Sequence, residues 1–309
     1  TSGAEGRFTL QIPRERAQHF AILATLRDGD EQAFEYITDA AETDAELEIK
    51  LRPAVPMEVS VVDGDGRPVP GARVVCQAQY SAIADTETDD SGRVVLKLPA
   101  GVAIGEVMAY RSGVGMDYWS AGHRGFTAAE EAPPPPEELT LTLDGALTVM
   151  VDVKDEDGAP VPGLGLMPYY IVKPERANVM LLTVPCESMS NEDGRVTFDW
   201  FPHDARQGIT LSLKTEEYSL LQRINWRPET IESVLQAVVL KRPLFSGVVT
   251  HRGEPVEGVL LRLQGRGPTH DQFGAQTVTD VDGRYEIRVS PRNSYIIASA
   301  DQELVGSLV

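Results

Sequence analysis

Basic residues are scarce in this 309-residue chain. It carries 28 Lys and Arg against 47 Asp and Glu, which gives a formal net charge of −19. Contacts to phosphate need clustered Lys and Arg, so this balance argues against binding to nucleic acid and to anionic membrane surfaces. The six lysines are Lys50, Lys97, Lys154, Lys173, Lys214 and Lys241.

Cysteine, long apolar runs and helical periodicity are also scarce. The two cysteines, Cys76 and Cys186, lie far apart in the sequence, so we expect buried free thiols and no disulfide. No apolar run approaches the roughly 18 residues of a membrane-spanning helix, which predicts no membrane insertion in this segment. Only residues 39–48 and 229–238 have a composition that favours a helical turn.

One phrase rich in Gly and Pro is present three times, at 63–72, 155–164 and 251–259. A second phrase that ends in Gly-Arg follows each copy, at 90–93, 192–195 and 281–284. The glycines Gly66, Gly158 and Gly253 are separated by 158 − 66 = 92 and 253 − 158 = 95 residues. A unit of this length is large enough to bury its own core, so the repeat predicts a row of small domains.

The runs on either side of these phrases alternate between apolar and polar residues, as in Met57–Val62 and Val94–Leu98. Asp-Gly between two such runs is typical of a hairpin turn. Roughly seven short strands per unit predict an all-β fold, built from tandem Ig-like or transthyretin-like antiparallel β-sandwich modules.

The period predicts three modules after an N-terminal partial module. Their expected limits are 1–55 for the C-terminal half of a module, then 56–145, 146–243 and 244–309. In the partial module we expect strands at 8–12, 19–25 and 46–51. The last module ends at 304–309 with no obvious final strand of the Glu-Leu-x-Ile-x-Leu kind. We therefore expect either that the chain is a segment of a longer array of modules or that another strand completes the first module.

The order of strand, Asp-x-Asp-Gly-x-Pro-Val-Pro-Gly-Ala, strand, Thr-Asp-x-x-Gly-Arg and strand resembles the carboxypeptidase regulatory-like family. Members of that family are transthyretin-like β-sandwiches, similar in layout to the B-type repeats of Gram-positive surface proteins. The resemblance is clearest over 57–102 and 245–300 and looser over 146–241. The motif carries no catalytic residues, so the resemblance implies an accessory or structural role.

Pairs of aspartates in the turns are candidate calcium ligands: Asp63, Asp65, Asp155, Asp157, Asp280 and Asp282. A calcium loop of the EF-hand type needs about six oxygen ligands and a Glu at its twelfth position, which none of these turns has. Asp is also a good turn former, so turn formation is the simpler interpretation and calcium is the alternative.

The segment 109–126 is the most unusual one in the chain, and we expect it to be a loop inserted between late strands. Tyr118, Trp119, His123 and Arg124 could form an aromatic platform there for a sugar or a protein partner. The alternative is that Trp119 caps the end of the sandwich.

No nucleophile elbow, phosphate loop or dinucleotide fingerprint is present, and no histidine pair has metal-binding spacing. We therefore expect no enzyme activity and, calcium apart, no cofactor. The predicted function is a non-catalytic structural, spacer or assembly region of a larger bacterial cell-surface, periplasmic or secreted multidomain protein. The short junctions at 143–147 and 240–244 predict semi-rigid neighbours.

Two alternatives for the function stay open. One is a subunit of a self-assembling extracellular filament, completed by strand addition between chains. The other is an accessory or carbohydrate-binding region of an enzyme whose catalytic domain lies outside this chain. The expected partners are accordingly proteins, further copies of the chain as a homo-oligomer, or glycans.

Overall fold

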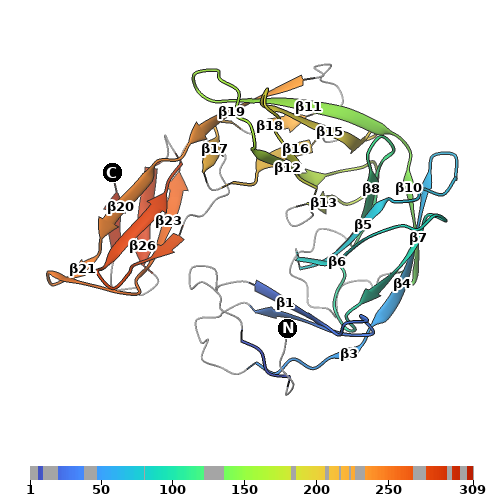
Figure 1. The fold of residues 1–309 in the computed structure, drawn as a ribbon, viewed down its shortest axis with the longest axis horizontal. Coiled ribbons are helices and arrows are strands. Elements are labelled where there is room, and N and C mark those ends of the chain that lie inside the picture. Colours follow the sequence, from blue (N-terminus) through green and yellow to red (C-terminus); the bar gives the residue numbers. More distant parts are fainter. Residues whose placement is uncertain are drawn as a thin grey trace.

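The computed structural model describes residues 6–9, 20–37, 47–79, 81–121, 136–181, 186–205, 209–215, 217–222, 224–226, 234–266, 276–290, 294–299 and 305–308. Every regular secondary-structure element within these residues is a β-strand (Figure 1), which confirms the all-β fold class. In this described part of the chain there is accordingly no helix with the length and apolarity needed to cross a membrane.

The N-terminal partial module contributes one sheet in the order β1-β2-β3. Its strands are β1 (Phe20–Thr25), β2 (Glu31–Ile37) and β3 (Arg52–Pro53). The strand predicted at 19–25 is confirmed by β1, whereas β2 was not predicted. The strand expected at 46–51 is not formed, because residues 47–51 belong to no strand. Most of the strand expected at 8–12 lies outside the described residues.

The strands between residues 55 and 143, called the first full module below, form two sheets in the orders β10-β4-β7 and β6-β5-β8-β9. The strands are β4 (Val55–Asp63), β5 (Arg73–Ala78), β6 (Ser81–Glu87), β7 (Arg93–Leu98), β8 (Glu106–Arg111), β9 (Gly115–Ser120) and β10 (Glu138–Leu143). Every second residue of β4 is buried, including Met57, Val59 and Val61. These side chains meet those of β5 and β8 in one apolar core, which makes the module a sandwich.

The strands between residues 146 and 241, called the second full module below, repeat this layout with the sheets β15-β11-β19-β17 and β13-β12-β16-β18, and β14 also pairs with β12. The strands are β11 (Ala146–Lys154), β12 (Gly165–Ile171), β13 (Val179–Met180), β14 (Ser188–Met189), β15 (Arg195–Pro202), β16 (Ile209–Leu213), β17 (Tyr218–Leu220), β18 (Ile224–Trp226) and β19 (Val234–Lys241). The helical turn considered for 229–238 is wrong for residues 234–238, which are part of β19.

One strand pair in each full module departs from the antiparallel pattern. The last strand of the module runs parallel to the first, as β10 does beside β4 and β19 beside β11. A parallel neighbour cannot be joined by a tight hairpin. The last strand reaches this position only after the chain has passed through the other sheet. It then covers one edge of the first strand.

The strands between residues 244 and 308, called the last module below, form a four-stranded sheet in the order β24-β23-β26-β27, a sheet of two strands, β20 and β25, and a small hairpin, β21-β22. The strands are β20 (Leu244–Val248), β21 (Thr250–His251), β22 (Glu254–Pro255), β23 (Leu260–Arg266), β24 (Gln276–Val278), β25 (Arg284–Arg288), β26 (Ser294–Ser299) and β27 (Val305–Leu308). Among the described residues, no strand lies beside β20 in the position that β10 and β19 occupy.

The glycine of the Gly-Arg phrase is required by a close approach of two backbone segments. Gly92, Gly194 and Gly283 have φ angles of 72°, 74° and 67°. A Cβ atom on these residues would lie 2.7, 2.5 and 2.6 Å from the carbonyl oxygens of Val61, Val153 and Val249. A side chain is therefore excluded at this position in all three modules, which explains why the phrase recurs.

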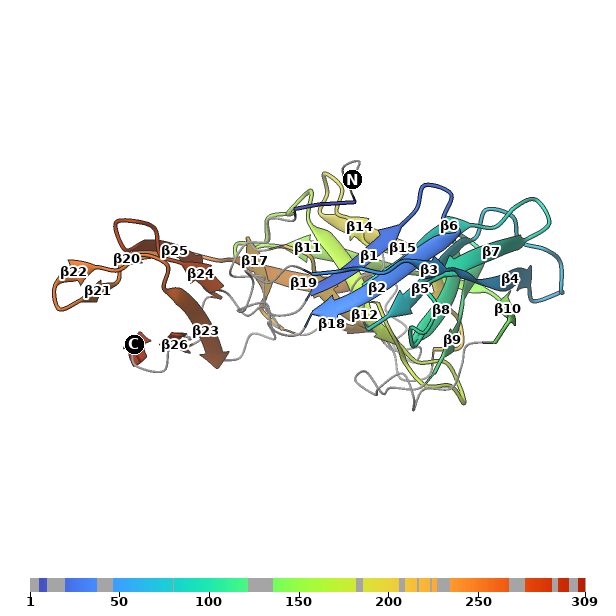
Figure 2. The same ribbon diagram turned by 90° about the horizontal axis from the view of Figure 1, so that it is seen from below.

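The modules follow an arc, from the N-terminal sheet through the two full modules to the last module (Figure 1). Seen from below, the last module extends away from the packed body formed by the others (Figure 2). This arrangement places a large interface between the two full modules.

Candidate functional site at the junction of the full modules

One sheet of the first full module carries buried apolar side chains on its outer face as well as on its inner face. In β5 and β8 neighbouring residues alternate between two cores: Val74 and Val107 face the core of their own module, whereas Val75 and Met108 join the core of the second full module. A strand buried on both faces needs a second layer to cover it. The second full module supplies that layer, so one apolar core continues across the junction.

The segment 109–126 is not the inserted loop that we expected. Residues 106–111 and 115–120 are the strands β8 and β9, which pair as a hairpin on the sheet that meets the second full module. Tyr110 in this hairpin contacts Trp200 across the junction, with ring centroids 4.9 Å apart.

Tyr118 is fully buried, so the expectation of an exposed platform is wrong for this residue. Its hydroxyl donates a hydrogen bond to the carbonyl oxygen of Ala177 (2.8 Å) and accepts one from the backbone N–H of Lys173 (2.9 Å). Trp119 is half-buried and packs against the core of the first full module, as the alternative expected. His123 and Arg124 lie outside the described residues.

A buried ion pair joins the two modules beside Tyr118. The ammonium of Lys173 lies 3.1 Å from Oδ1 of Asp117, and the two side chains are only 5% and 2% exposed. Nη1 of Arg176 donates to the same oxygen (2.6 Å), and the backbone N–H of Thr142 donates to Oδ2 (2.9 Å). Both carboxylate oxygens are thus satisfied, as a buried charge requires.

Three further polar groups gather at the edge of this ion pair. One ligand atom from each of Asp144, His203 and Asp204 lies within 4.8 Å of the others, which makes them a possible metal-binding group among the described residues. The ammonium of Lys173 is 3.6 Å from Asp144 and 3.7 Å from Asp204. A metal ion there would be repelled by this ammonium, so the group fits a lysine counter-charge better than a metal site.

Glu106 is a second carboxylate buried at the junction. Its Oε1 accepts a hydrogen bond from the backbone N–H of Met180 in the second full module (3.1 Å). With its amide turned to donate, Gln77 places its nitrogen 2.8 Å from Oε2 of Glu106. Burial raises the pKa of Glu106 to about 7, because no cation compensates the loss of water.

Both cysteines are free and buried, as the sequence predicted. Burial raises the pKa of Cys186 to about 12 and raises that of Cys76 as well. Both groups are therefore unreactive thiols near neutral pH.

The turn aspartates have a structural task in each module. Oδ1 of the leading residue accepts hydrogen bonds of 2.8 to 3.0 Å from the backbone N–H groups two and four positions further on. The leading residues are Asp63, Asp155 and Asp280, and the second aspartates are Asp65, Asp157 and Asp282. Asn191 makes the same two bonds in the second full module (3.1 and 2.8 Å), so the turn needs an acceptor and not a charge.

Calcium binding at these turns remains a prediction without a supporting geometry. Asp65 lies 2.7 Å from the guanidinium of Arg67, which already balances its charge. Among the described residues, neither Asp63 nor its counterparts belong to a group of three acidic, histidine or cysteine side chains close enough to share an ion.

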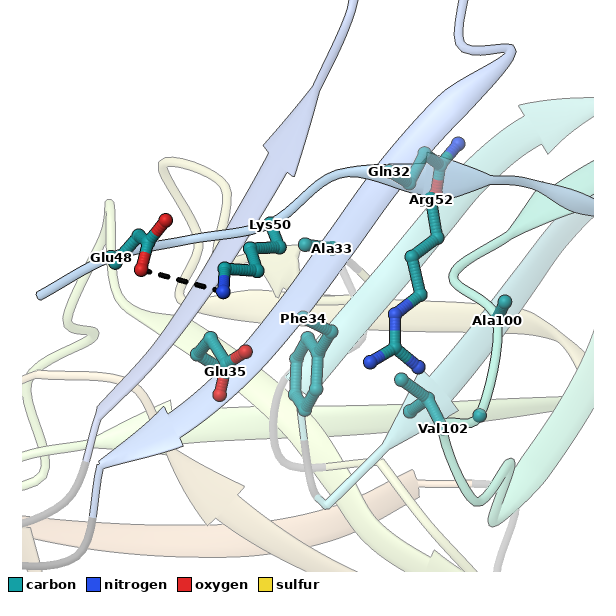
Figure 3. Close-up of a pocket in the computed structure, with 10 residues that line it drawn as sticks. Gln32, Ala33, Phe34, Glu35, Glu48, Lys50, Arg52, Ala100 and Val102 are labelled. Atoms are coloured by element: carbon teal, nitrogen blue, oxygen red, sulfur yellow. Dashed lines mark ion pairs between the residues drawn. The ribbon is translucent and has the colours of Figure 1, made fainter. Parts of the chain in front are cut away.

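A hollow of about 380 Å³ lies between the N-terminal sheet and the first full module. Figure 3 shows Glu35 from β2 and Lys50 and Arg52 from the segment before β4 around it, with an ion pair of 3.5 Å between Lys50 and Glu48. The charged side chains of both signs are exposed. The hollow is therefore an open gap between modules and lacks the apolar lining of a typical ligand pocket.

No family model matches the chain, and no curated protein matches it in sequence. Three similar solved structures are bacterial proteins. Over 94% of this chain and 54% of its own length, the TIE protein of Bacillus anthracis is 10% identical, with a TM-score of 0.23. The Streptococcal ancillary pilin is 8% identical over 82% of this chain and 95% of its own, with a TM-score of 0.29.

A single B repeat unit of the collagen-binding surface protein of Staphylococcus aureus is 11% identical over 62% of this chain and 100% of its own, with a TM-score of 0.21. The matches thus include the class of surface repeat that the sequence motif resembles. This chain spans about half the length of the Bacillus anthracis protein. At these identities and TM-scores, the β-sandwich assignment rests on the strand topology described above.

Proposed function

We propose that this chain is a non-catalytic spacer region of a larger bacterial cell-surface, periplasmic or secreted protein. It is built from a partial module (1–55) and three β-sandwich modules (56–145, 146–243 and 244–309), and it holds its flanking parts at a set distance and angle. Its partners are then proteins and not nucleic acid, in keeping with its net charge of −19.

The observation that carries this proposal is the continuous core between the two full modules. Val75, Met108, Met116 and Tyr118 from the first module share that core with the second. Independent domains on a tether would instead keep polar outer faces, because an apolar face is stable only where it is covered. The junction therefore behaves as one stiff, bent element.

Small-angle X-ray scattering of the full chain tests this stiffness. We expect a pair-distance distribution that one curved conformation reproduces. The variant Met108→Arg places a charge in the shared core and should broaden the distribution, whereas Val95→Arg, on an exposed position of β7, should not. Scattering from the unaltered chain that requires many relative orientations of residues 56–145 and 146–243 would contradict the proposal.

A further inference from the structure

The first and last strands of each full module are parallel neighbours. In the first full module, residues 58–63 of β4 pair with residues 138–143 of β10. In the second, residues 150–154 of β11 pair with residues 234–238 of β19. The chain enters each module through the first strand of this pair and leaves it through the last. Because parallel strands begin at the same end, the chain enters at one end of the pair and leaves at the other.

This geometry determines how a stretching force acts on each pair. A force that pulls the two ends of the first full module apart draws β4 and β10 in opposite directions along their own axes. The hydrogen bonds between the two strands are then loaded in shear and all at once. A pair of strands that is pulled from one end opens one bond after another instead. Since each backbone bond contributes little by itself, the resistance to force depends on how many bonds must break together.

The loaded pairs follow one another along the chain with almost no slack between them. Only residues 144–145 separate the end of β10 from the start of β11. The strands β4, β10, β11 and β19 lie along the outer side of the arc (Figure 1). A force along the chain therefore passes directly from the first parallel pair to the second.

A buried carboxylate supports β10 on the side away from β4. The backbone N–H of Glu58 donates to the carbonyl oxygen of Glu137 (2.9 Å), so the odd-numbered residues of β10 turn their backbone groups towards β4. Thr142 turns the other way, and its N–H donates to Oδ2 of Asp117 (2.9 Å). Asp117 is held in turn by Lys173 of the second full module. The ion pair at the junction thus ties the loaded strand β10 to the next module.

We propose that the two full modules are load-bearing elements, in which tension along the chain is carried in shear by the pairs β4–β10 and β11–β19. This role deepens the spacer function and rests on it, because a spacer transmits any tension between its flanking parts. Among the described strands, β19 has a neighbour on each side, whereas β10 pairs with β4 alone. The first full module should therefore yield before the second.

Optical tweezers measure the rupture force of the full chain through handles on two introduced cysteines at exposed positions. In the variant Val55→Cys/Lys241→Cys the force enters before the first pair and leaves after the second, so both pairs are loaded in shear. In the variant Val55→Cys/Glu137→Cys the force acts at the starts of β4 and β10 and opens the same pair from one end. Cys76 and Cys186 are buried, so they do not take up handles.

The comparison of the two pulling directions is the main test. At the same loading rate we expect the first variant to rupture at about twice the force of the second or more, because several hydrogen bonds break together in shear. Equal rupture forces in the two directions would overturn the proposal.

One hydrogen bond within the loaded pair provides a local test. Ser60 lies two residues after Glu58, so its N–H also faces β10. Ser60→Pro removes this donor, and the chain loaded through positions 55 and 241 should then rupture about tenfold faster at a fixed force. The control is Val95→Pro. Val95 lies opposite Glu58 on β7 and turns its N–H to the outer edge of the sheet, so its rupture rate should be unaltered.

Circular dichroism establishes that each variant is folded. An unaltered rupture rate in Ser60→Pro would overturn the assignment of β4–β10 as the loaded pair. If Ser60→Pro does not fold, the two pulling directions still decide, because they use the unaltered Ser60. Scattering measures the stiffness of the junction without any load. A chain with equal rupture forces can therefore remain a stiff spacer, and a chain that is flexible in scattering fails as a spacer whatever its rupture force.

Discussion

Two junctions in this chain have links of the same length and different packing. Residues 144–145 join β10 to β11, and residues 242–243 join β19 to β20. At the first junction a shared core and a buried Lys173–Asp117 pair bind the modules together. The core cluster that crosses that junction contains no residue of the last module. The stiffness of a tandem array is therefore set by the outer faces of the sheets and not by linker length alone.

The largest expected effect on the free energy of unfolding comes from breaking the buried ion pair at the junction, compared with an ion pair on the surface. Asp117→Ala removes the nearest carboxylate from buried Lys173, whose ammonium keeps only the more distant Asp144 and Asp204, and we expect a loss of about 3–5 kcal/mol in the free energy of unfolding. Urea denaturation of the full chain measures it. The exposed Arg73–Asp85 pair is the control, where Asp85→Ala should cost about 0–1 kcal/mol. Equal losses in both variants would show that the junction is not a buried interface.

A pair of core truncations compares the first full module with the last. Met57→Ala removes a fully buried side chain and should cost about 2–5 kcal/mol. Phe245→Ala removes a side chain that is 41% exposed, so we expect a smaller loss. Thermal unfolding of the two variants measures both losses. A larger loss for Phe245→Ala than for Met57→Ala would show that Phe245 is buried in solution.

The hydroxyl of Tyr118 tests how much one group that bonds across the junction adds to stability. Tyr118→Phe leaves the carbonyl of Ala177 and the N–H of Lys173 without their bonds across the junction. We expect a loss of about 1–3 kcal/mol, with no change in the denaturant m value because the fold is kept. An unaltered midpoint of unfolding would show that water replaces the hydroxyl.

Glu106 makes the junction sensitive to pH. Its pKa is raised to about 7 in the folded chain, above its ordinary value of 4.5. Its contribution to stability is therefore fully present below pH 4.5 and is lost as the pH rises from 4.5 through 7, by about 1.4 kcal/mol per pH unit at most. Glu106→Gln should remove this slope from a pH series of unfolding midpoints. The same slope in the variant would assign the effect to another group.

The turns show where sequence reasoning was sufficient. Asp63 accepts a hydrogen bond from a residue two positions further on, and Gly92 lies against one neighbouring strand. Both contacts are short-range, so a sequence motif is enough to predict them. The strands on either side follow from their alternation. The leading aspartates Asp63, Asp155 and Asp280 are explained by the hydrogen bonds that they accept in their own turns, whereas calcium binding stays a prediction.

The hairpin 106–120 shows where sequence reasoning failed. Tyr118 was one of four residues predicted to form an exposed platform, because 109–126 was expected to be an inserted loop. The sequence did contain a signal in the runs 74–76 and 107–109, because each consists of consecutive apolar residues and does not alternate. A strand without alternation is covered on both faces, and this would have predicted a second layer over the sheet.

The sequence by itself determined the period, the all-β class and the turns, because these depend on contacts between residues close in the chain or on one repeated strand pairing. Only the tertiary structure decided which outer face meets the next module and how Asp117, Lys173 and Tyr118 converge. Those features depend on groups from different modules, and their distances follow from the packing of whole sheets, which no local pattern encodes.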